Sequence, residues 1–419
     1  MATTDVVVIG AGTVGASIAY ELSRRGVGVV VLDEGPDIGN GCSYANAGLL
    51  APSHVEPLTT PANVRAGLRY LFTPDSPFHM HPSPRLVPWF ARFVRASGPE
   101  RARQLTARMQ ELARHGVRLH ADYAERGLET GYEQRGSLDV YLTERAFERA
   151  RPGAPAERLD GNDARAMEPL LGSVAGAVHW PDDAQVGTQQ YLRAVLGQAQ
   201  EHGAEVRWGT RARLVPRSDG RIASVDTAGE RITAHTYVVA AGLGSSRLCA
   251  QVGVRMPMEG AKGYVIDLDG QGPRPSRPLA LREPKVVVTP YSDRVRLCGT
   301  LELGGDPATT TMSRLEAIRA AGRRGLPGLG DRSTVQTWAG LRPCTADGVP
   351  ALGRSGIRKD LVVATGHGMW GLVLAPVSGD LIARGIADSA PTMHEAAFSP
   401  DRFGAARRFR RAEESTTAA

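Results

Sequence analysis

The stretch DVVVIGAGTVGASIAYELSRRGVGVVVLDEG, from Asp5 to Gly35, decides the fold of this chain. It begins with a β-branched run at Val6 to Ile9, as expected of a strand buried on both faces of a parallel sheet. A glycine-rich loop and a helical segment from Ala16 to Arg24 follow, and a second apolar run covers Val27 to Leu32. Together these segments predict a complete β-α-β unit.

The glycines of this unit fit a bound pyrophosphate. Gly10 permits the tight turn out of the strand, and Gly12 lets a pyrophosphate approach the backbone without a Cβ in the way. Gly15 lets the helix lie close to the sheet, so that its free N–H groups and positive dipole end face the phosphates. The pattern predicts a dinucleotide site and fits both FAD and NAD.

Acidic residues end the second strand of the unit. Asp33 lies about twenty residues beyond the glycines, where a carboxylate accepts hydrogen bonds from an adenosine ribose, and Glu34 is the neighbouring candidate. A carboxylate suits a free 2′-hydroxyl and repels a 2′-phosphate, so NADP is disfavoured.

The composition is that of an ordinary soluble globular protein. With 419 residues, of which 42% are hydrophobic and 22% charged, the chain is long enough for two or three domains. The formal net charge of +6 comes largely from arginines scattered along helical segments. No RNA- or DNA-binding motif surrounds them, so we expect no nucleic-acid partner.

The residues before the first strand indicate the compartment. Met1 to Asp5 leaves no room for a secretory signal, and no apolar run approaches the roughly twenty residues of a spanning helix. We therefore expect a cytoplasmic protein, at most peripheral to the inner face of the membrane. The cysteines are too widely separated for a disulfide framework or a zinc site, so we expect reduced thiols at Cys42, Cys249, Cys298 and Cys344.

The next part of the chain mixes loops with one long helix. Asn40 to Gly48 is a small, polar loop suited to lining a ligand with backbone N–H groups. The proline-broken segment from Pro52 to Pro88 is expected to wrap around the molecule rather than form sheet. Glu100 to Leu128 is predicted to be one amphipathic helix, and the polar tail beyond Phe398 is expected to fray.

Later segments predict two further groups of strands. Glu205 to Val215 and Arg221 to Thr227 are predicted strands joined by the Asp219-Gly220 turn. A buried β-branched strand ending at Gly242 has the same pattern as the first strand, an apolar run followed by glycine. It would bring another backbone turn to the same ligand. Strand-like segments between Lys262 and Leu301 predict a second, antiparallel sheet.

The chain resembles the FAD-dependent D-amino acid oxidase and glycine oxidase superfamily in five stretches that occur in the family's order. These are the glycine-rich loop, CSYANAG at 42–48, VVAAGLGS at 238–245, LRPCTADGVPALG at 341–353 and GHGMWG at 366–371. The resemblance covers Asp5 to Ala387, and within the superfamily the chain looks most like the small subunit-type D-amino acid dehydrogenases.

The resemblance implies an α/β fold: a Rossmann-like FAD-binding domain with a discontinuous substrate domain built on an antiparallel sheet. The FAD-binding domain would comprise residues 1–84, 158–250 and 338–400. The substrate domain would comprise residues 85–157 and 251–337, followed by a flexible tail at 401–419.

The resemblance also implies where FAD lies. Its pyrophosphate would lie on Gly10, Gly12 and Gly15. Its ribose would contact Asp33 or Glu34, and its adenine would lie beside Ala212. The isoalloxazine ring would rest against Ser43, Asn46, Ala47 and Gly48. N–H groups would point at its pyrimidine side, where negative charge gathers on reduction, from Gly368, Met369, Trp370 and Gly371.

Two departures from the family pattern bear on the cofactor. Some relatives attach flavin through a cysteine, and Cys344 lies near that region but not at the matching position, so we expect non-covalent FAD. The family's Thr-Pro-Asp-Gly reads Thr345-Ala346-Asp347-Gly348 here, which affects only local loop rigidity.

On the substrate side, Arg342 in GLRP lies at a position similar to that of the family's carboxylate-binding arginine, and a guanidinium offers a bidentate fork to a carboxylate. A surface or interdomain salt bridge is the alternative role for this arginine. Tyr264 and Tyr291 are candidates for a phenolic hydrogen bond or for packing, and His54 and His367 are the histidines near flavin motifs. The implied reaction passes the Cα hydride of a D-amino acid to flavin N5 and needs no metal; the imino acid then hydrolyses to a 2-oxo acid.

Other functions fit the same motifs. One is oxidation of glycine, sarcosine or hydroxyproline, or of a larger biosynthetic amine. Another, of a different class, is a non-catalytic FAD-binding scaffold or sensor, against which Arg342 argues. The expected partners are a small-molecule amino acid or amine and an electron acceptor, either oxygen or a quinone or other carrier.

Overall fold

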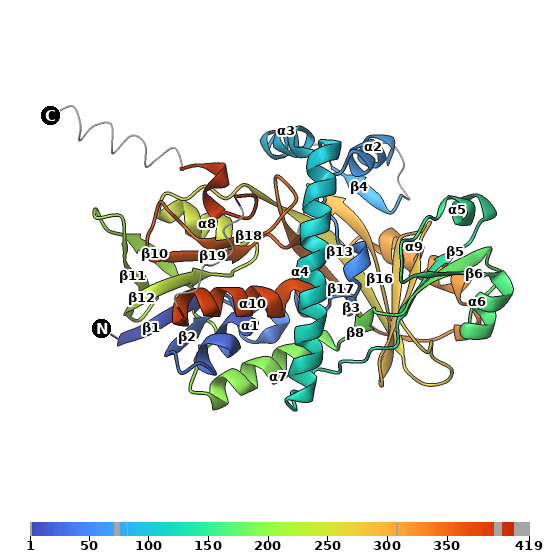
Figure 1. Ribbon diagram of the computed structural model, residues 1–419, viewed down its shortest axis with the longest axis horizontal. Coiled ribbons are helices and arrows are strands. Elements are labelled where there is room, and N and C mark those ends of the chain that lie inside the picture. Colours follow the sequence, from blue (N-terminus) through green and yellow to red (C-terminus); the bar gives the residue numbers. More distant parts are fainter. Residues whose placement is uncertain (1, 71–75, 82, 307–308, 389–395, 406–419) are drawn as a thin grey trace.

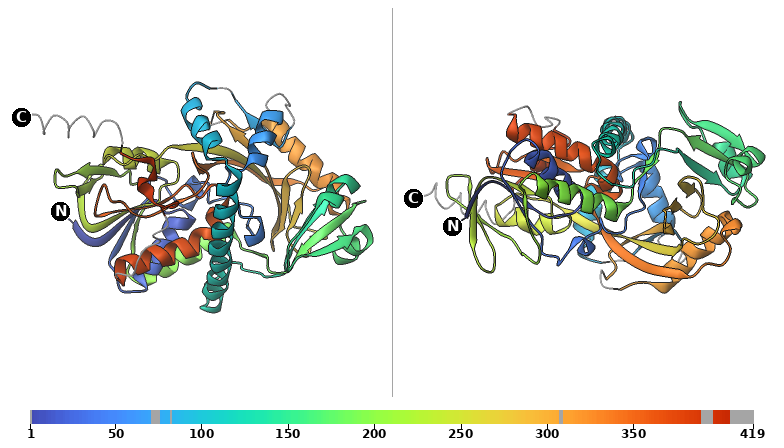
Figure 2. Two further views of the ribbon diagram at one scale, coloured as in Figure 1. Left: turned by 45° about the horizontal axis from the view of Figure 1, so that its top comes forward. Right: turned by 90° about the horizontal axis from the view of Figure 1, so that it is seen from below.

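The computed structural model describes residues 2–70, 76–81, 83–306, 309–388 and 396–405. Within these residues the chain builds two large sheets, which lie at the left and the right of Figure 1. The long helix α4 (Pro99–Glu125) crosses the molecule near the junction between them, as the left view of Figure 2 also shows. The predicted α/β fold with two unlike sheets is confirmed.

The first sheet contains the β-α-β unit. Its strands follow the order β10-β11-β12-β1-β2-β9, with β19 beside β12 and β18 beside β19. They are β1 (Ala2–Ile9), β2 (Val29–Leu32), β9 (Glu205–Arg207), β10 (Arg213–Pro216), β11 (Ile222–Asp226), β12 (Arg231–Val239), β18 (Ala351–Arg354) and β19 (Leu361–Thr365). Strands β9, β2, β1, β12 and β19 run parallel, while β10, β11 and β18 pair antiparallel.

Helices cover both faces of the first sheet. They are α1 (Thr13–Ser23), α7 (Thr188–Glu201), α8 (Gly244–Gln251) and α10 (Gly371–Ala387). Val6 and Val8 point into one core with α1, α7, α10 and α4, whereas Val7 and Ile9 point into another with α8, β10 and β11. The first strand is therefore buried on both faces, as its β-branched residues predict.

One helix among the described residues is long and apolar enough to cross a membrane. It covers Gly368–Ala387 with a mean hydropathy of 1.2, and 56% of it is buried inside the molecule. Its neighbours are α1 and α4. Burial of this kind is what a core helix shows, so its hydropathy is explained by packing.

The second sheet is mostly antiparallel, with the order β17-β13-β16-β15-β14-β5-β7-β6 and β4 beside β16. Its strands are β4 (Phe78–Met80), β5 (Ser137–Tyr141), β6 (Glu157–Asp160), β7 (Gly176–Trp180), β13 (Met258–Asp269), β14 (Leu279–Leu281), β15 (Val286–Pro290), β16 (Arg294–Leu303) and β17 (Thr334–Thr345). One face packs on α6 (Gly161–Met167) and α9 (Met312–Gly325). Shorter elements complete the fold: α2 (Pro61–Tyr70), α3 (Val87–Ala96), α5 (Glu144–Arg149), and the pair β3 (Leu49–Leu50) and β8 (Ala184–Gln185).

Two predictions about single segments are wrong. The segment from Pro52 to Pro88 does contribute to sheet, because Phe78 to Met80 has no proline and pairs as β4 with β16. Glu205 to Val215 is not one strand, since Gly209 lies at positive φ between β9 and β10. The Asp219-Gly220 turn does join β10 to β11.

The end of the chain is tied down as far as the structure describes it. Residues Pro400–Phe403 form a 3-10 turn, and Arg402 donates two hydrogen bonds to Asp347, at 2.7 and 3.0 Å. The expected fraying beyond Phe398 is therefore wrong for residues up to 405. The rest of the predicted tail, residues 406–419, lies outside the described residues.

The division into domains stays a proposal, and the sheets suggest moving its boundaries. Residues 176–180, which the prediction assigns to the FAD-binding domain, pair with β5 in the second sheet. Helix α4, assigned to the substrate domain, packs against α10 of the first sheet. We propose that the domain boundaries follow the two sheets.

Candidate active site

The glycine-rich loop leaves the N-terminus of α1 open to a ligand. Gly10 has φ +110°, and a Cβ there would lie 2.5 Å from the carbonyl oxygen of Ala240. A Cβ on Gly15 would overlap the carbonyl oxygen of Gly10, so this glycine allows the close approach of helix and strand. Gly12 caps α1 without a side-chain hydrogen bond. The N–H of Thr13 is bonded to Ser43, and the N–H groups that follow it in the first turn are available to an anion.

Asp33 organises this loop. Its Oδ2 accepts a hydrogen bond from the N–H of Ala11 at 2.7 Å, and its Oδ1 accepts one from Gly35 at 2.8 Å. Both oxygens keep further lone pairs for a ribose. Glu34 is half exposed and lies 3.5 Å from both Arg211 and Arg247.

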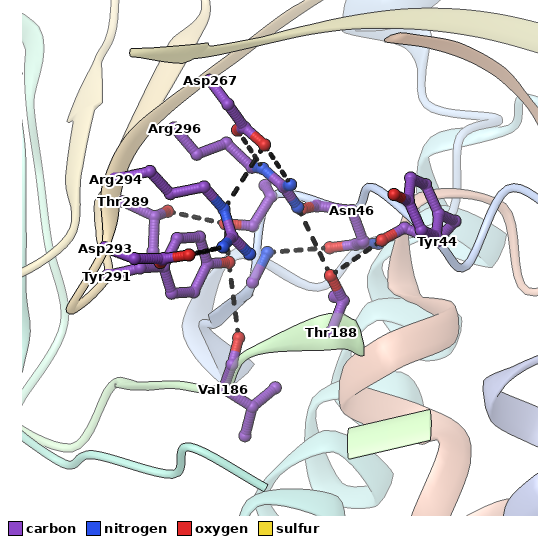
Figure 3. A network of polar contacts seen from close by, with 12 residues as sticks. Tyr44, Asn46, Val186, Thr188, Asp267, Thr289, Tyr291, Asp293, Arg294 and Arg296 are labelled. Carbon is purple, nitrogen blue, oxygen red and sulfur yellow. Dashed lines mark hydrogen bonds and ion pairs between the residues drawn. The ribbon is translucent and has the colours of Figure 1, made fainter. Parts of the chain in front are cut away.

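The loop at 43–48 lies against α1 and is held from the second sheet. The Oγ of Ser43 accepts the N–H of Thr13 at 3.1 Å. From the other side, Arg296 donates to the carbonyl of Asn46 at 2.9 Å and Thr289 donates to that of Ala47 at 2.6 Å (Figure 3). The two sheets therefore jointly fix this loop.

Arg296 is itself buried and forms a two-point pair with Asp267, both bonds being 2.7 Å long. Burial alone would lower the pKa of Arg296, but the bonds to Asp267 outweigh burial and raise it above its usual value. Arg296 therefore stays charged over the physiological pH range. Sequence reasoning missed it, because a charged residue within a strand gives no sign of its partner.

Tyr291 supports the same loop rather than reaching the cavity. Its hydroxyl lies 3.4 Å from the carbonyl oxygen of Val186 and 3.5 Å from that of Ala47. Gly48, at φ +77°, leaves room for this hydroxyl, because a Cβ there would overlap it. Tyr264 also points away: its hydroxyl bonds Glu302 and Thr311, and its ring is buried in the core of the second sheet.

A cavity of about 1250 Å³ joins the glycine-rich loop to the second sheet. Most residues predicted for the site line it: Gly10, Gly12, Asp33, Glu34, Ser43, Asn46, Ala47, His54, Ala212, Gly242, Arg342, His367, Gly368, Met369, Trp370 and Gly371. Four predicted residues do not line it, namely Gly15, Gly48, Tyr264 and Tyr291. Two of these are the glycines whose contacts shape the loops, and two are the packed tyrosines.

Arg342 extends from β17 across the sheet into the cavity. Its Nη1 donates to the carbonyl of Thr300 at 3.2 Å, and its Nη2 lies 3.9 Å from the sulfur of Cys298. Within the described residues, no carboxylate lies within 4.0 Å of the guanidinium, so the predicted alternative of an interdomain salt bridge finds no partner there. A charged fork without an anionic partner is suited to a carboxylate ligand.

His54 is held between two carboxylates at the wall of the cavity. Its Nε2 lies 2.8 Å from Asp139, and its Nδ1 lies 4.0 Å from Asp183. Burial works to raise the pKa of Asp139, but the bond and charge of His54 together with Arg282 hold it below its usual value. Burial raises the pKa of Asp183 to about 7. No sequence pattern predicts these carboxylates, because they lie far from His54 along the chain.

His367 is buried, and its Nε2 lies 3.0 Å from the hydroxyl of Ser378. Burial lowers its pKa to about 4, so it is neutral at physiological pH. The residues after it form a 3-10 turn at Gly368–Trp370 that leads into α10 without a side-chain cap. The carbonyl of His367 accepts the N–H of Trp370 at 3.0 Å, so the N–H groups of Gly368 and Met369 are the ones available at the cavity wall.

Comparison with known proteins identifies the family to which this chain belongs. The sequence matches the family described as FAD dependent oxidoreductase over residues 5–384. It is 33% identical over 396 residues to a D-amino acid dehydrogenase of Paramagnetospirillum magneticum, covering 90% of this chain and 94% of the relative. A D-amino acid dehydrogenase of Methylobacterium nodulans is 31% identical, over 93% of this chain and 97% of the relative.

Solved structures of similar fold include two oxidases. Glycine oxidase from Geobacillus kaustophilus superposes with a TM-score of 0.74 and 25% identity, covering 96% of this chain and 99% of that one. Iminodiacetate oxidase from Chelativorans sp. BNC1 superposes with a TM-score of 0.71 and 26% identity, covering 94% and 98%.

Proposed function

This chain belongs to the family of FAD-dependent oxidoreductases, and we propose that it oxidises a D-amino acid to an imino acid that water converts to a 2-oxo acid. The observation that carries the substrate class is Arg342, a cation that lines the cavity without a protein carboxylate within 4.0 Å among the described residues. It would bind the substrate carboxylate through both nitrogens of its fork.

The residues of the first sheet fit FAD. The pyrophosphate would bind at the N-terminus of α1, where Gly12 has no side chain to obstruct it. Asp33 and Glu34 would bind the ribose. The loop at 43–48 and the turn at 368–371 lie on the same cavity and would flank the ring. When bound, FAD supplies the acceptor for the hydride that leaves the substrate Cα.

Non-covalent binding is part of the proposal. Burial raises the pKa of the Cys42 thiol and raises that of Cys344 to about 12, although nearby Arg342 works in the opposite direction. Both sulfurs are therefore protonated at neutral pH. Because the thiolate is the nucleophile of cysteine chemistry, neither is prepared for attachment to flavin.

We infer that the chain's own residues act mainly by positioning the substrate. Arg342 would hold the Cα over the flavin ring, an effect of orientation rather than of acid–base chemistry. His54 has a protein partner at Nε2, the 2.8 Å contact with Asp139, and its Nδ1 lies 3.3 Å from Ser53. We propose that it supports the cavity wall instead of taking a proton from the substrate.

The relatives favour a second candidate substrate within the same reaction. Glycine oxidase and iminodiacetate oxidase share this fold at 25% and 26% identity, so a small achiral amino acid or a secondary amine is the alternative substrate. The electron acceptor, oxygen or a quinone or other carrier, and a cytoplasmic location with at most peripheral membrane contact also belong to the proposal.

The test is anaerobic mixing of the yellow holoenzyme with D- and L-amino acids, glycine, sarcosine and D-hydroxyproline, followed by flavin absorbance. Bleaching by the D-series and not by the L-series supports the proposal. Readmitting air then distinguishes an oxidase, which regains its colour, from a dehydrogenase. Bleaching by glycine or sarcosine alone would favour the second candidate, and bleaching by none of the compounds would contradict both.

A further inference from the structure

The cavity contains a second cationic position besides Arg342. Lys285 lies in the turn between β14 and β15 and lines the cavity, as does Val287 two residues further on. Its side chain is exposed, and within the described part of the chain no carboxylate lies within 4.0 Å of its Nζ. An ammonium group that lines a cavity without a partner is available to an anionic ligand.

The backbone at this position is strained. Lys285 has φ +56° and Thr300 has φ +64°, and among the described residues these are the two non-glycine residues with positive φ. The ladder of β15 and β16 pairs Val286 with Gly299, so Lys285 and Thr300 are the next residues along it. Such strain costs about 1–3 kcal/mol per residue and clusters at functional sites.

The strained pair connects the two cations. The carbonyl of Thr300 accepts the hydrogen bond of Arg342, so the guanidinium lies over β16. Lys285 immediately precedes β15, which pairs with β16 in the same sheet. Both side chains line one continuous cavity. A ligand in this cavity is therefore exposed to both cations.

The carboxylates nearby do not balance these cations. Asp139 is already engaged, because its Oδ2 contacts His54 and Trp180 and its Oδ1 lies 3.6 Å from Arg282. Glu283 accepts hydrogen bonds from the backbone at Leu142 and Thr143. Glu56 also lines the cavity, and the charges that act on it are those of Lys285, Arg282 and His54. The wall therefore keeps an excess of positive charge. Burial and the charge of Arg282 lower the pKa of Lys285, against the opposing charges of Asp139, Glu56 and Glu283.

We propose that the substrate carries a second anionic group, which Lys285 binds while Arg342 binds the α-carboxylate. The substrate class is then a dicarboxylic D-amino acid of the size of D-aspartate or D-glutamate. This inference rests on the proposed function for the role of Arg342 and adds the subsite for the side chain.

Ligand binding tests the subsite without turnover. The holoenzyme is titrated with glutarate and with glutaramate, its monoamide, and binding is followed by the change in flavin absorbance. We expect glutarate to bind at least about tenfold more tightly than glutaramate, since only glutarate can contact both cations with a carboxylate.

The variant Lys285→Met should remove this difference in affinity, and Lys285→Arg should keep most of it. Lys359→Met is the matched control, because Lys359 is exposed and does not line the cavity. Equal binding of the two ligands to the wild type would overturn the subsite.

Kinetics separate this inference from the proposed function. Anaerobic flavin reduction is measured with D-glutamate and D-glutamine in the wild type and in Lys285→Met. We expect the half-saturating concentration of D-glutamate to rise at least about tenfold in the variant, with that of D-glutamine unchanged. Reduction by D-amino acids with no preference for the acid would overturn the subsite alone. If no D-amino acid reduces the flavin, the proposed function fails, and the titration with glutarate still decides whether the dianion subsite exists.

Discussion

The guanidinium of Arg342 lies directly over Gly263, in space that any side chain at position 263 would occupy. A Cβ built on Gly263 would overlap Nη1, Nη2 and Cζ of Arg342. Gly263 pairs with Gly340 across β13 and β17, two residues from Arg342, so neighbouring strands supply both the arginine and the gap that it fills. The glycine therefore determines where the proposed carboxylate clamp points.

Gly263→Ala should displace the clamp without unfolding the protein, because the overlapping atoms are the end of a flexible side chain. We expect kcat/KM for a D-amino acid to fall by a factor that corresponds to about 2 kcal/mol of lost transition-state stabilisation, the scale for losing a charged hydrogen-bond partner. Flavin content and the unfolding midpoint should stay at wild-type values. Steady-state kinetics of the variant with full flavin occupancy check this prediction. Unchanged kinetics would mean that the position of Arg342 over Gly263 is not needed to bind the substrate carboxylate.

Gly12→Val should give folded protein without flavin. The new side chain would enter the cavity at the N-terminus of α1, where a Cβ already lies 3.0 Å from the Oγ of Ser43. The ratio of flavin to protein absorbance after purification is the measurement. Gly98→Ala is the control, since a Cβ there meets nothing within 4 Å. A Gly12→Val protein with full flavin occupancy would refute the placement of the pyrophosphate.

Arg296→Ala should destabilise the protein by about 3 kcal/mol, because it removes two hydrogen bonds from the buried carboxylate of Asp267 and leaves only the 3.3 Å contact with Arg294. Urea denaturation gives the free energy of unfolding. The double variant Arg296→Met with Asp267→Leu should recover most of this loss, since the pair is then replaced by apolar groups of similar size. It should still lose flavin more readily than the wild type, because the carbonyl of Asn46 no longer has its donor. A double variant no more stable than Arg296→Ala would argue against an unpaired charge as the cause.

Asp183→Asn should change how stability depends on pH. Burial raises the pKa of Asp183 from 3.8 to about 7, against the opposing effects of His54 and Ser137. Between these values the folded protein binds a proton that the unfolded chain releases, so this group's contribution to stability falls as pH rises. The variant should therefore gain stability relative to the wild type from about pH 4 to about pH 7, and the difference should be constant above that. Unfolding free energies measured across this range provide the check, and a difference independent of pH would show that Asp183 is not buried in its acid form.

The nucleotide half of the site could be predicted because its chemistry is local in sequence. Gly10, Gly12 and Asp33 belong to one β-α-β unit, and their spacing alone places them at one strand edge. The loop at 43–48 is predicted from its position directly after this unit and from the family resemblance, and the turn at 368–371 from the resemblance. The cavity is lined by Ser43, Asn46 and Ala47 of the loop and by all four residues of the turn.

The substrate half could not be predicted in the same way. His54, Asp139 and Lys285 come from distant parts of the chain and meet only because β5 pairs with β14, and β14 with β15. Alternation along a strand shows that its two faces differ but not which face meets a cavity. Tyr264 and Tyr291 illustrate this, since both are strand-associated tyrosines near the site and both turn away from the cavity.

Stopped-flow reduction of the flavin tests the central claim most directly, namely that Arg342 holds a D-amino acid by its carboxylate. D-glutamate and its α-carboxamide, D-isoglutamine, are each mixed anaerobically with the wild type and with Arg342→Ala. We predict that D-glutamate reduces the wild-type flavin far faster than D-isoglutamine does, and that Arg342→Ala loses about 2 kcal/mol of this preference or more. Equal reduction by the two compounds, or a preference that survives in Arg342→Ala, would contradict the account.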